Sequence, residues 1–243
     1  MKIDNVILAS NSNPKYLDFW PIVSNAWENL GINPYLFYIG KEKFEDNRII
    51  NFDIEELNSS FVSQNIRLLA PALFPDKVSI ISDIDNMPLS VNYYQKNIEG
   101  VNKDSFVVYR PDAASSDMIS IMWNAALGST WGEIFNIKSE PDILRTLRSW
   151  CPEDYEIEGT NWYFDQVKLR ESVENFRKSN PDRVTELNDK ETGFLRLNRI
   201  DMGFSFNKFY NKENQYTDFH MPRPYKKYKK VIDKVYQLNF EEK

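Results

Sequence analysis

The sequence predicts an α/β protein in which a mixed, mostly parallel sheet is flanked by helices. Three short apolar runs, residues 6–9, 35–39 and 78–82, have the length and composition of buried strands. Two segments with helical spacing separate them. This alternation of strand and helix is typical of parallel sheets with crossover connections. Ligands of such sheets bind at the carboxyl ends of the strands, so a site is expected where the first and third strands end.

A polar loop and a helix are predicted between the first two strands. Strand 6–9 runs into a polar stretch, residues 10–14, which is typical of a loop. Apolar residues spaced three or four apart then predict one continuous helix over residues 16–30. Gly31 ends that helix, and strand 35–39 comes after it.

A helix from Phe61 leads towards Phe74 and the third strand, 78–82. That strand runs directly into Asp83-Ile84-Asp85, and Pro88 is expected to open the next helix. Residues beyond 100 show a weaker pattern. We expect strands at 106–109 and 194–197, helices at 142–150 and 162–176, and an amphipathic helix near the C-terminus. No repeat or linker interrupts the chain, which predicts a single domain over residues 1–243.

Composition excludes several classes of protein. The 243 residues include one cysteine, Cys151, and one histidine, His220, so disulfide scaffolds, cysteine-rich zinc modules and sites with two imidazoles are excluded. The net charge of −6 argues against nucleic acid as a partner. No apolar run approaches the roughly 20 residues of a membrane span, and residues 1–4 hold no apolar signal core. We therefore expect a cytoplasmic protein without an integral membrane segment.

Asp83 and Asp85 are the strongest chemical signal. They lie two residues apart after a strand, and residues with this spacing in extended backbone face the same side. Two neighbouring carboxylates repel each other, and a bound divalent cation relieves the repulsion. Carboxylate oxygens suit Mg²⁺ or Mn²⁺. The alternative is a solvated turn in which the aspartates cap the backbone.

Several segments resemble GT-A fold glycosyltransferases. VSIISDIDNMP, residues 78–88, looks like the metal-binding Asp-x-Asp segment of these enzymes. The similarity extends to other short segments, which are VILASNSNPKYLDFWPIVSNAW (6–27), SQNIRLLAP (63–71), NAALGS (124–129), WGEIF (131–135) and the Asp-Gln motif in WYFDQ (162–166). The resemblance implies a GT-A-like domain. Its nucleotide-binding half covers about residues 1–100, and its acceptor-binding half, with a C-terminal tail or lid, covers about residues 101–243.

The resemblance also implies a metal-dependent glycosyltransferase that moves a sugar from a nucleotide-diphosphate sugar to a hydroxyl of a glycan or small-molecule acceptor. The donor is expected to be a UDP-sugar because uridine is the common donor nucleotide among similar enzymes. Mn²⁺ or Mg²⁺ would neutralise the departing diphosphate. The metal ligands implied are Asp83, Asp85 and His220, with Asp218 as the fallback for His220. The positions implied for nucleotide-sugar binding are Ala9, Ser10, Asn11, Arg67, Asp83, Ile84, Asp85 and Gln166.

Asp165 is the expected catalytic carboxylate. In an inverting enzyme it would take the proton of the acceptor hydroxyl, and in a retaining enzyme it would hold the sugar. The sequence leaves both outcomes open. Glu133 and Asp201 are rival bases.

Two further features have open interpretations. The basic segment 222–230 is either a lid that closes over the diphosphate or, as we favour, a solvated helix face. Trp123, Trp131 and Trp162 either form an apolar wall for an acceptor sugar or pack in the core, which is the commoner fate of tryptophan.

Three other functions compete with glycosyl transfer. A phosphatase of the haloacid dehalogenase type would use Asp83 as its nucleophile, but its motif has Thr or Val where Met87 stands here. A nucleotidylyltransferase would need a Gly-x-Gly-x-Arg loop, which the sequence lacks. A non-catalytic module that binds a nucleotide-sugar stays open.

Overall fold

The computed structural model describes residues 1–199 and 216–241 of the chain. Within these residues, seven strands form the main sheet. They are β1 (Asn5–Asn11), β2 (Asn33–Ile39), β3 (Ile49–Asn51), β4 (Val78–Ile81), β6 (Phe106–Val108), β7 (Asn124–Leu127) and β8 (Val184–Glu186). Their order is β3-β2-β1-β4-β7-β6-β8. Strand β7 runs antiparallel to β4 and β6, and the other neighbours are parallel. The predicted mixed, mostly parallel sheet is therefore confirmed.

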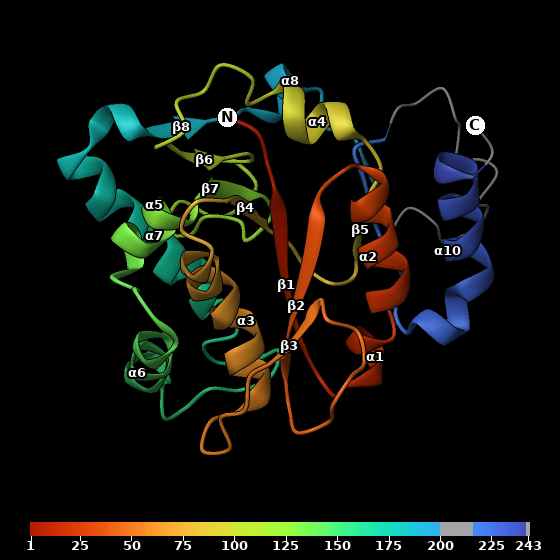
Figure 1. Ribbon diagram of the computed structural model, residues 1–243, viewed down its shortest axis with the longest axis horizontal. Coiled ribbons are helices and arrows are strands. Elements are labelled where there is room, and N and C mark those ends of the chain that lie inside the picture. Colours follow the sequence, from red (N-terminus) through yellow and green to blue (C-terminus); the bar gives the residue numbers. More distant parts are fainter. Residues whose placement is uncertain (200–215, 242–243) are drawn as a thin grey trace.

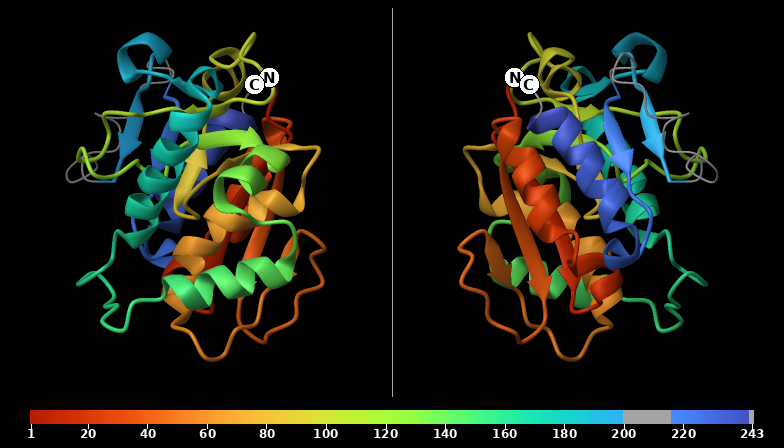
Figure 2. Two further views of the ribbon diagram at one scale, coloured as in Figure 1. Left: turned by 90° about the vertical axis from the view of Figure 1, so that its left-hand side faces the viewer. Right: turned by 90° about the vertical axis from the view of Figure 1, so that its right-hand side faces the viewer.

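Helices cover both faces of this sheet (Figure 1). They are α1 (Pro14–Leu17), α2 (Trp20–Asn29), α3 (Ser59–Leu69), α4 (Val91–Lys96), α5 (Gly128–Phe135), α6 (Glu140–Trp150), α7 (Phe164–Ser179), α8 (Asp189–Thr192) and α10 (Tyr225–Phe240), with 3₁₀ turns η1 (Ala70–Leu73) and η2 (Pro181–Arg183). Helix α3 packs on β1 and β2 and is joined there by α5, α6 and α7. Helix α2 packs on β2 from the opposite side, and α10 packs on α2 (Figure 2).

A second, small sheet brings the C-terminal segment back to the residues after β4. Strand β10 (Asp218–His220) pairs antiparallel with β5 (Asn86–Pro88) and parallel with β9 (Arg196–Asn198). The register places His220 opposite Asn86. The amide of Met221 also donates to the carbonyl oxygen of Asp85 at 2.9 Å. Strand pairing therefore fixes His220 beside the second aspartate of the Asp-x-Asp segment.

Three predictions about local structure were wrong. The loop expected over residues 10–14 is shorter, because β1 continues to Asn11 and α1 begins at Pro14. The helix expected over residues 16–30 is divided at Asp18–Phe19 into α1 and α2, and Pro21 stands in the first turn of α2, where its missing amide hydrogen costs nothing. Pro88 does not open a helix. It ends β5, because pairing with β10 holds residues 86–88 extended. Helix α4 begins at Val91, after Ser90 caps it by accepting from the amide of Tyr93 at 3.3 Å.

The elements predicted beyond residue 100 exist with shifted ends. Strand β6 ends at Val108 rather than residue 109, and β9 begins at Arg196 rather than 194. Helix α6 begins two residues earlier than expected, at Glu140, and α7 begins two residues later, at Phe164. These displacements are small, but the last one puts Asp165 in the first turn of α7.

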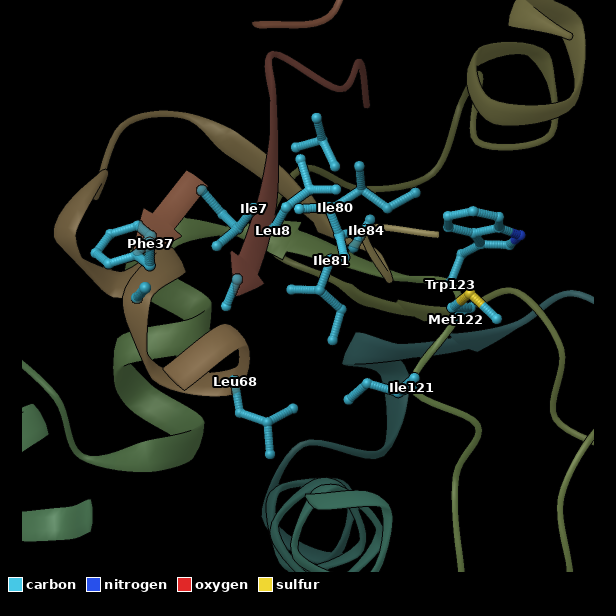
Figure 3. Close-up of a cluster of buried hydrophobic side chains, with 14 of the residues drawn as sticks. Ile7, Leu8, Phe37, Leu68, Ile80, Ile81, Ile84, Ile121, Met122 and Trp123 are labelled. Atoms are coloured by element: carbon cyan, nitrogen blue, oxygen red, sulfur yellow. The ribbon is translucent and has the colours of Figure 1, made fainter. Parts of the chain in front are cut away.

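The buried apolar side chains form one continuous cluster that runs from Ile3 to Val235. Figure 3 shows part of it around β1, β4 and the segment 121–123. Trp123 and Trp131 are fully buried in this cluster, so neither forms the acceptor wall that was one of their two interpretations. Ile84 belongs to the same cluster as Ile80 and Ile81 and is 4% exposed, which anchors the loop between the two aspartates (Figure 3).

Helix α10 is tied to α2 along its length. The ring of Tyr225 meets Phe19 edge-on at 5.6 Å, and the side-chain amide of Asn29 donates to the Tyr236 hydroxyl at 2.9 Å. Among the helices of residues 1–199 and 216–241, none has the length and apolar character to cross a membrane.

Candidate functional site

A cavity of about 580 Å³ opens at the carboxyl ends of β1 and β4. Its lining comes from the end of β1 and the start of α1, helix α3, the loop after β4, the segment leading into α7 and the C-terminal segment around β10, with Ile121 and Arg199 in addition. The residues assigned to the site from sequence all line this cavity. They are Ala9, Ser10, Asn11, Arg67, Asp83, Ile84, Asp85, Asp165, Gln166 and His220.

The end of β1 forms a polar shelf in the cavity. The hydroxyl of Ser10 donates to the carbonyl of Asn11 at 3.0 Å. The side-chain amide of Asn11 donates to Ser59 and Ser60 at 3.0 and 3.3 Å, at the start of α3. These bonds hold the strand end against the start of the helix.

Arg67, in the last turn of α3, joins two carboxylates. One guanidinium nitrogen bonds to Asp83 and to the carbonyl of Ser82, and the other lies 3.3 Å from Asp165. The side chains of Arg67 and Asp165 are only 7% and 4% exposed. Arg67 therefore connects the Asp-x-Asp segment with α7 inside the protein.

The pKa of Asp165 is higher than that of an ordinary aspartate. Its burial is the main cause that raises its pKa to about 6, and the neighbouring charge of Asp83 adds to the rise. The charge of Arg67 and the amide of Gln166, which donates to the carboxylate at 2.9 Å, oppose it. A carboxylate with this pKa is ionised at neutral pH but binds a proton more readily than a surface aspartate, which suits acid–base chemistry.

Three basic side chains lie close to one carboxylate oxygen of Asp85. Its Oδ2 lies 2.9 Å from Arg199 Nη1, 3.4 Å from Arg223 Nε and 3.7 Å from His220 Nε2. Burial alone would raise the pKa of Asp85, but His220, Arg223 and Arg199 outweigh it and hold the pKa below the ordinary value. Asp85 is therefore an anion throughout the physiological pH range.

Carboxylate oxygens of Asp83 and Asp85 and the imidazole of His220 border the same cavity, and this donor chemistry fits Mn²⁺ or Mg²⁺. Their present partners are cations, however. Arg67 holds Asp83, while Arg199 and Arg223 hold Asp85. Accordingly, no group of three His, Cys, Asp or Glu side chains in the described part of the chain stands ready to hold an ion. The donor types are present, and arginines engage both carboxylates.

Sequence reasoning missed Arg199 and Arg223 as partners of Asp85. The sequence pattern assigns Arg223 only to the basic segment and gives Arg199 no role. Arg223 stands three residues after His220, and Arg199 directly follows β9, so each leaves a strand of the small sheet near Asp85. Arg199 follows the predicted strand 194–197, which was a usable signal, but no strand was predicted before Arg223, and placing either arginine needed the pairing of β9, β10 and β5.

The sequence offered Trp162 as part of an apolar wall, but it missed the other cavity residues of the loop before α7, which are Ile157, Glu158, Gly159 and Tyr163. The side chain of Gln64 holds this loop to α3, accepting from the Tyr155 hydroxyl at 2.8 Å and donating to the Trp162 carbonyl at 3.2 Å. Trp162 lines the cavity, as do Ile157 and Tyr163, which are 60% and 57% exposed. These exposed apolar groups form the rim of the cavity.

Other candidates lie elsewhere. Asp218, the fallback metal ligand, is fully buried and bonds to Arg196 rather than lining the cavity. Glu133, a rival base, pairs with Arg183 away from the cavity. Asp201, the other rival, lies outside the described residues. No residue of segment 124–135, which resembles a sugar- and acceptor-side segment, lines the cavity.

The basic segment 222–230 divides into two parts. Arg223 faces the cavity, and its guanidinium lies 5.0 Å from the centre of the Tyr16 ring. From Tyr225 onward the segment is the first turns of α10, where Lys226 pairs with Asp18 at 3.1 Å and is 78% exposed. The lid interpretation stays a prediction.

The chain resembles solved structures but matches no protein-family model and no curated sequence. A glycosyltransferase involved in glycosylation of the major capsid of PBCV-1 is 12% identical, with a TM-score of 0.46, over 95% of this chain and 100% of that one. The apo-form glycosyltransferase GlyE of Streptococcus pneumoniae TIGR4 is 9% identical, with a TM-score of 0.47, over 99% of this chain and 64% of that one. A likeness at these scores carries no conclusion about the activity of this chain.

Proposed function

We propose that this protein is a metal-dependent glycosyltransferase that moves a sugar from a nucleotide-diphosphate sugar, with UDP as the nucleotide, to a hydroxyl of a glycan or small-molecule acceptor. The observation that carries the proposal is the meeting of five separate segments in one cavity. The end of β1, Arg67, the Asp-x-Asp loop, Asp165-Gln166 and His220 are far apart in sequence and line the same space.

The donor would lie along the floor of the cavity. The shelf of Ala9, Ser10 and Asn11 offers hydroxyl, amide and backbone groups that suit a base and ribose. Asp85 and His220, with Asp83 near them, would hold Mn²⁺ or Mg²⁺, which when bound neutralises the charge that develops on the departing diphosphate. Ile84 keeps the two aspartates in place because it is anchored in the core.

Asp165 would act at the transferred sugar. Its carboxylate is ionised above pH 6 and Arg67 fixes its orientation through a contact of 3.3 Å. As a general base it accepts the proton of the acceptor hydroxyl, and in a retaining reaction it holds the sugar instead. The rim, with exposed Ile157 and Tyr163 and half-buried Trp162, suits the acceptor, because sugar C–H faces pack well on aromatic rings.

Binding and transfer test this proposal separately. A panel of nucleotide-sugars, with and without Mn²⁺, should raise the thermal unfolding midpoint, most strongly for one UDP-sugar with the metal present. Asp165→Asn should keep UDP binding but lower the transfer rate by about 10²- to 10⁴-fold, the usual worth of a positioned acid or base. Glu171→Gln, on the exposed side of the same helix, is the matched control.

Two results would count against the proposal. If no nucleotide-sugar raises the unfolding midpoint, a nucleotide-sugar is not the donor. If Asp165→Asn keeps the turnover of the original chain, Asp165 takes no part in the chemistry. A trapped aspartyl phosphate on Asp83 with phosphatase substrates would favour the competing phosphatase. Donor binding without transfer or hydrolysis would favour the alternative function, a non-catalytic module that binds a nucleotide-sugar.

A further inference from the structure

Two arginines share a single carboxylate at the wall of the cavity. Asp85 Oδ2 is 2.9 Å from Arg199 Nη1 and 3.4 Å from Arg223 Nε. The side chain of Asp85 is 7% exposed, whereas those of Arg199 and Arg223 are 26% and 21% exposed. The carboxylate is therefore enclosed, and both guanidinium groups reach the space where a ligand would lie.

Positive and negative side chains are unevenly distributed along the cavity wall. Among the described residues that line it, Lys15 pairs with Glu158, and Arg67 serves both Asp83 and Asp165. Asp85 is then the remaining carboxylate of the lining for Arg199 and Arg223 together. Around Asp85 the positive charge exceeds the negative by one unit, while around Arg67 the reverse holds.

Such an arrangement suits an anion with several oxygens. A guanidinium carries five N–H donors in a planar fork that matches phosphate oxygens, and one carboxylate oxygen satisfies few of them. Arg223 is also steadied by the hydroxyl and ring of Tyr16, which orients it before a ligand binds. The cavity is thus lined by two guanidinium forks beside Asp85, in addition to Arg67.

We infer that Arg199 and Arg223 are ligands of the donor diphosphate, and that they neutralise Asp85 only until diphosphate and dication arrive together. The inference rests on the proposed function. A dication that approaches Asp85 alone must displace two guanidinium groups. A diphosphate gives those groups a new partner, so metal and nucleotide should each strengthen the binding of the other by the same factor.

The test uses two ligands whose responses should have opposite signs. Binding of Mn²⁺ alone is followed by the electron paramagnetic resonance signal of the free ion, and binding of UDP at saturating Mn²⁺ is followed by calorimetry. Arg199→Gln and Arg223→Gln each remove a competitor for Asp85, so Mn²⁺ alone should bind about two- to fivefold tighter. Each also removes a charged hydrogen bond to the diphosphate, so UDP should bind about tenfold or more weakly.

Controls separate this inference from its alternatives. Arg145→Gln, an exposed arginine of α6 with 73% exposure, should change neither affinity. UMP lacks the second phosphate, so the loss of affinity should be much smaller for UMP than for UDP. Arg223→Lys keeps the charge without the fork and should recover part of the UDP affinity. Circular dichroism checks that each variant is folded.

Three outcomes would overturn the inference. One is UDP affinity in both variants equal to that of the original chain. Another is an equal loss for UMP and UDP, which would move the arginines away from the diphosphate. The third is Mn²⁺ binding that weakens together with UDP binding, which indicates a structural role. Absence of UDP binding in the original chain is a different result, since it rejects the proposed function itself.

Discussion

Two clusters of arginine and aspartate lie at opposite ends of the same pair of strands, β9 and β10. At one end, Arg196 bonds to Asp218 through Nε and Nη2 at 2.8 and 2.6 Å, and the carboxylate is completely buried. At the other end, Arg199 and Arg223 share Asp85 beside the cavity. The first pair is closed and matched one to one, whereas the second is open and has a surplus of positive charge.

The difference between these clusters separates stability from function. A closed pair of one cation and one anion has no surplus charge and holds two strands in register, and Arg196 and Asp218 are indeed register partners. An open cluster with more cations than carboxylates has binding capacity left over. Asp218 and Asp85 are both buried aspartates bonded to arginine, so residue type alone does not distinguish them, but the number of partners and access to the cavity do.

The largest expected effect comes from breaking the closed pair. Arg196→Met leaves Asp218 as a buried charge without its main partner, which should lower the free energy of unfolding by about 3–5 kcal/mol. Urea denaturation measures this loss. Adding Asp218→Leu removes the stranded charge and should restore much of the stability. In the fraction that stays folded, UDP affinity should change less than twofold. A large fall in UDP affinity with little loss of stability would reverse the roles assigned to the two clusters.

A smaller effect on stability but a decisive one on binding is expected at the open cluster. Asp85→Asn removes a proposed metal ligand and should weaken UDP binding in the presence of Mn²⁺ by at least about a hundredfold, since even indirect partners of metal ligands cost 10- to 100-fold. Calorimetry with and without Mn²⁺ measures the change. Asp112→Asn, on an exposed loop, is the matched control. Undiminished UDP affinity would show that no metal acts through Asp85.

Much of this molecule was predictable because its signals are local. The apolar run 78–81 specifies β4, and the polar residues at the end of β1 and after β4 must meet at one sheet edge, which brings Ser10 and Asp83 together. Asp165 was found through a short motif. In each case a few adjacent residues carry the information, and the parallel sheet does the rest.

What escaped prediction depends on contacts between distant segments. Residues 86–88 form a strand only because β10, some 130 residues later, pairs with them, and the proline that suggested a helix start sits at the end of that strand. The same pairing carries Arg199 and Arg223 to Asp85. The side-chain pattern of one segment does not specify which distant strand pairs with it, so the cluster of Arg199, Arg223 and Asp85 could not be predicted from such patterns.

The smallest effect concerns the two carboxylates that the cavity shifts in opposite directions. Burial raises the pKa of Asp165 to about 6, whereas His220 and the arginines keep the pKa of Asp85 low despite its burial. Because the folded chain binds the proton of Asp165 more tightly than the unfolded chain does, the contribution of Asp165 to stability falls as pH rises from about 4 to 6.

Catalysis should show the complementary trend, because only ionised Asp165 can accept a proton or hold a developing positive charge. At saturating UDP-sugar and Mn²⁺, kcat should fall about tenfold from pH 7 to pH 5, with a midpoint near 6. Saturation removes changes in metal and donor affinity from the measurement. Arg67→Lys keeps a positive charge near Asp165 but loses the second hydrogen-bonding arm, so the midpoint should move upward. A profile that is flat between pH 5 and 7, or a midpoint that ignores Arg67, would mean that another group moves the proton.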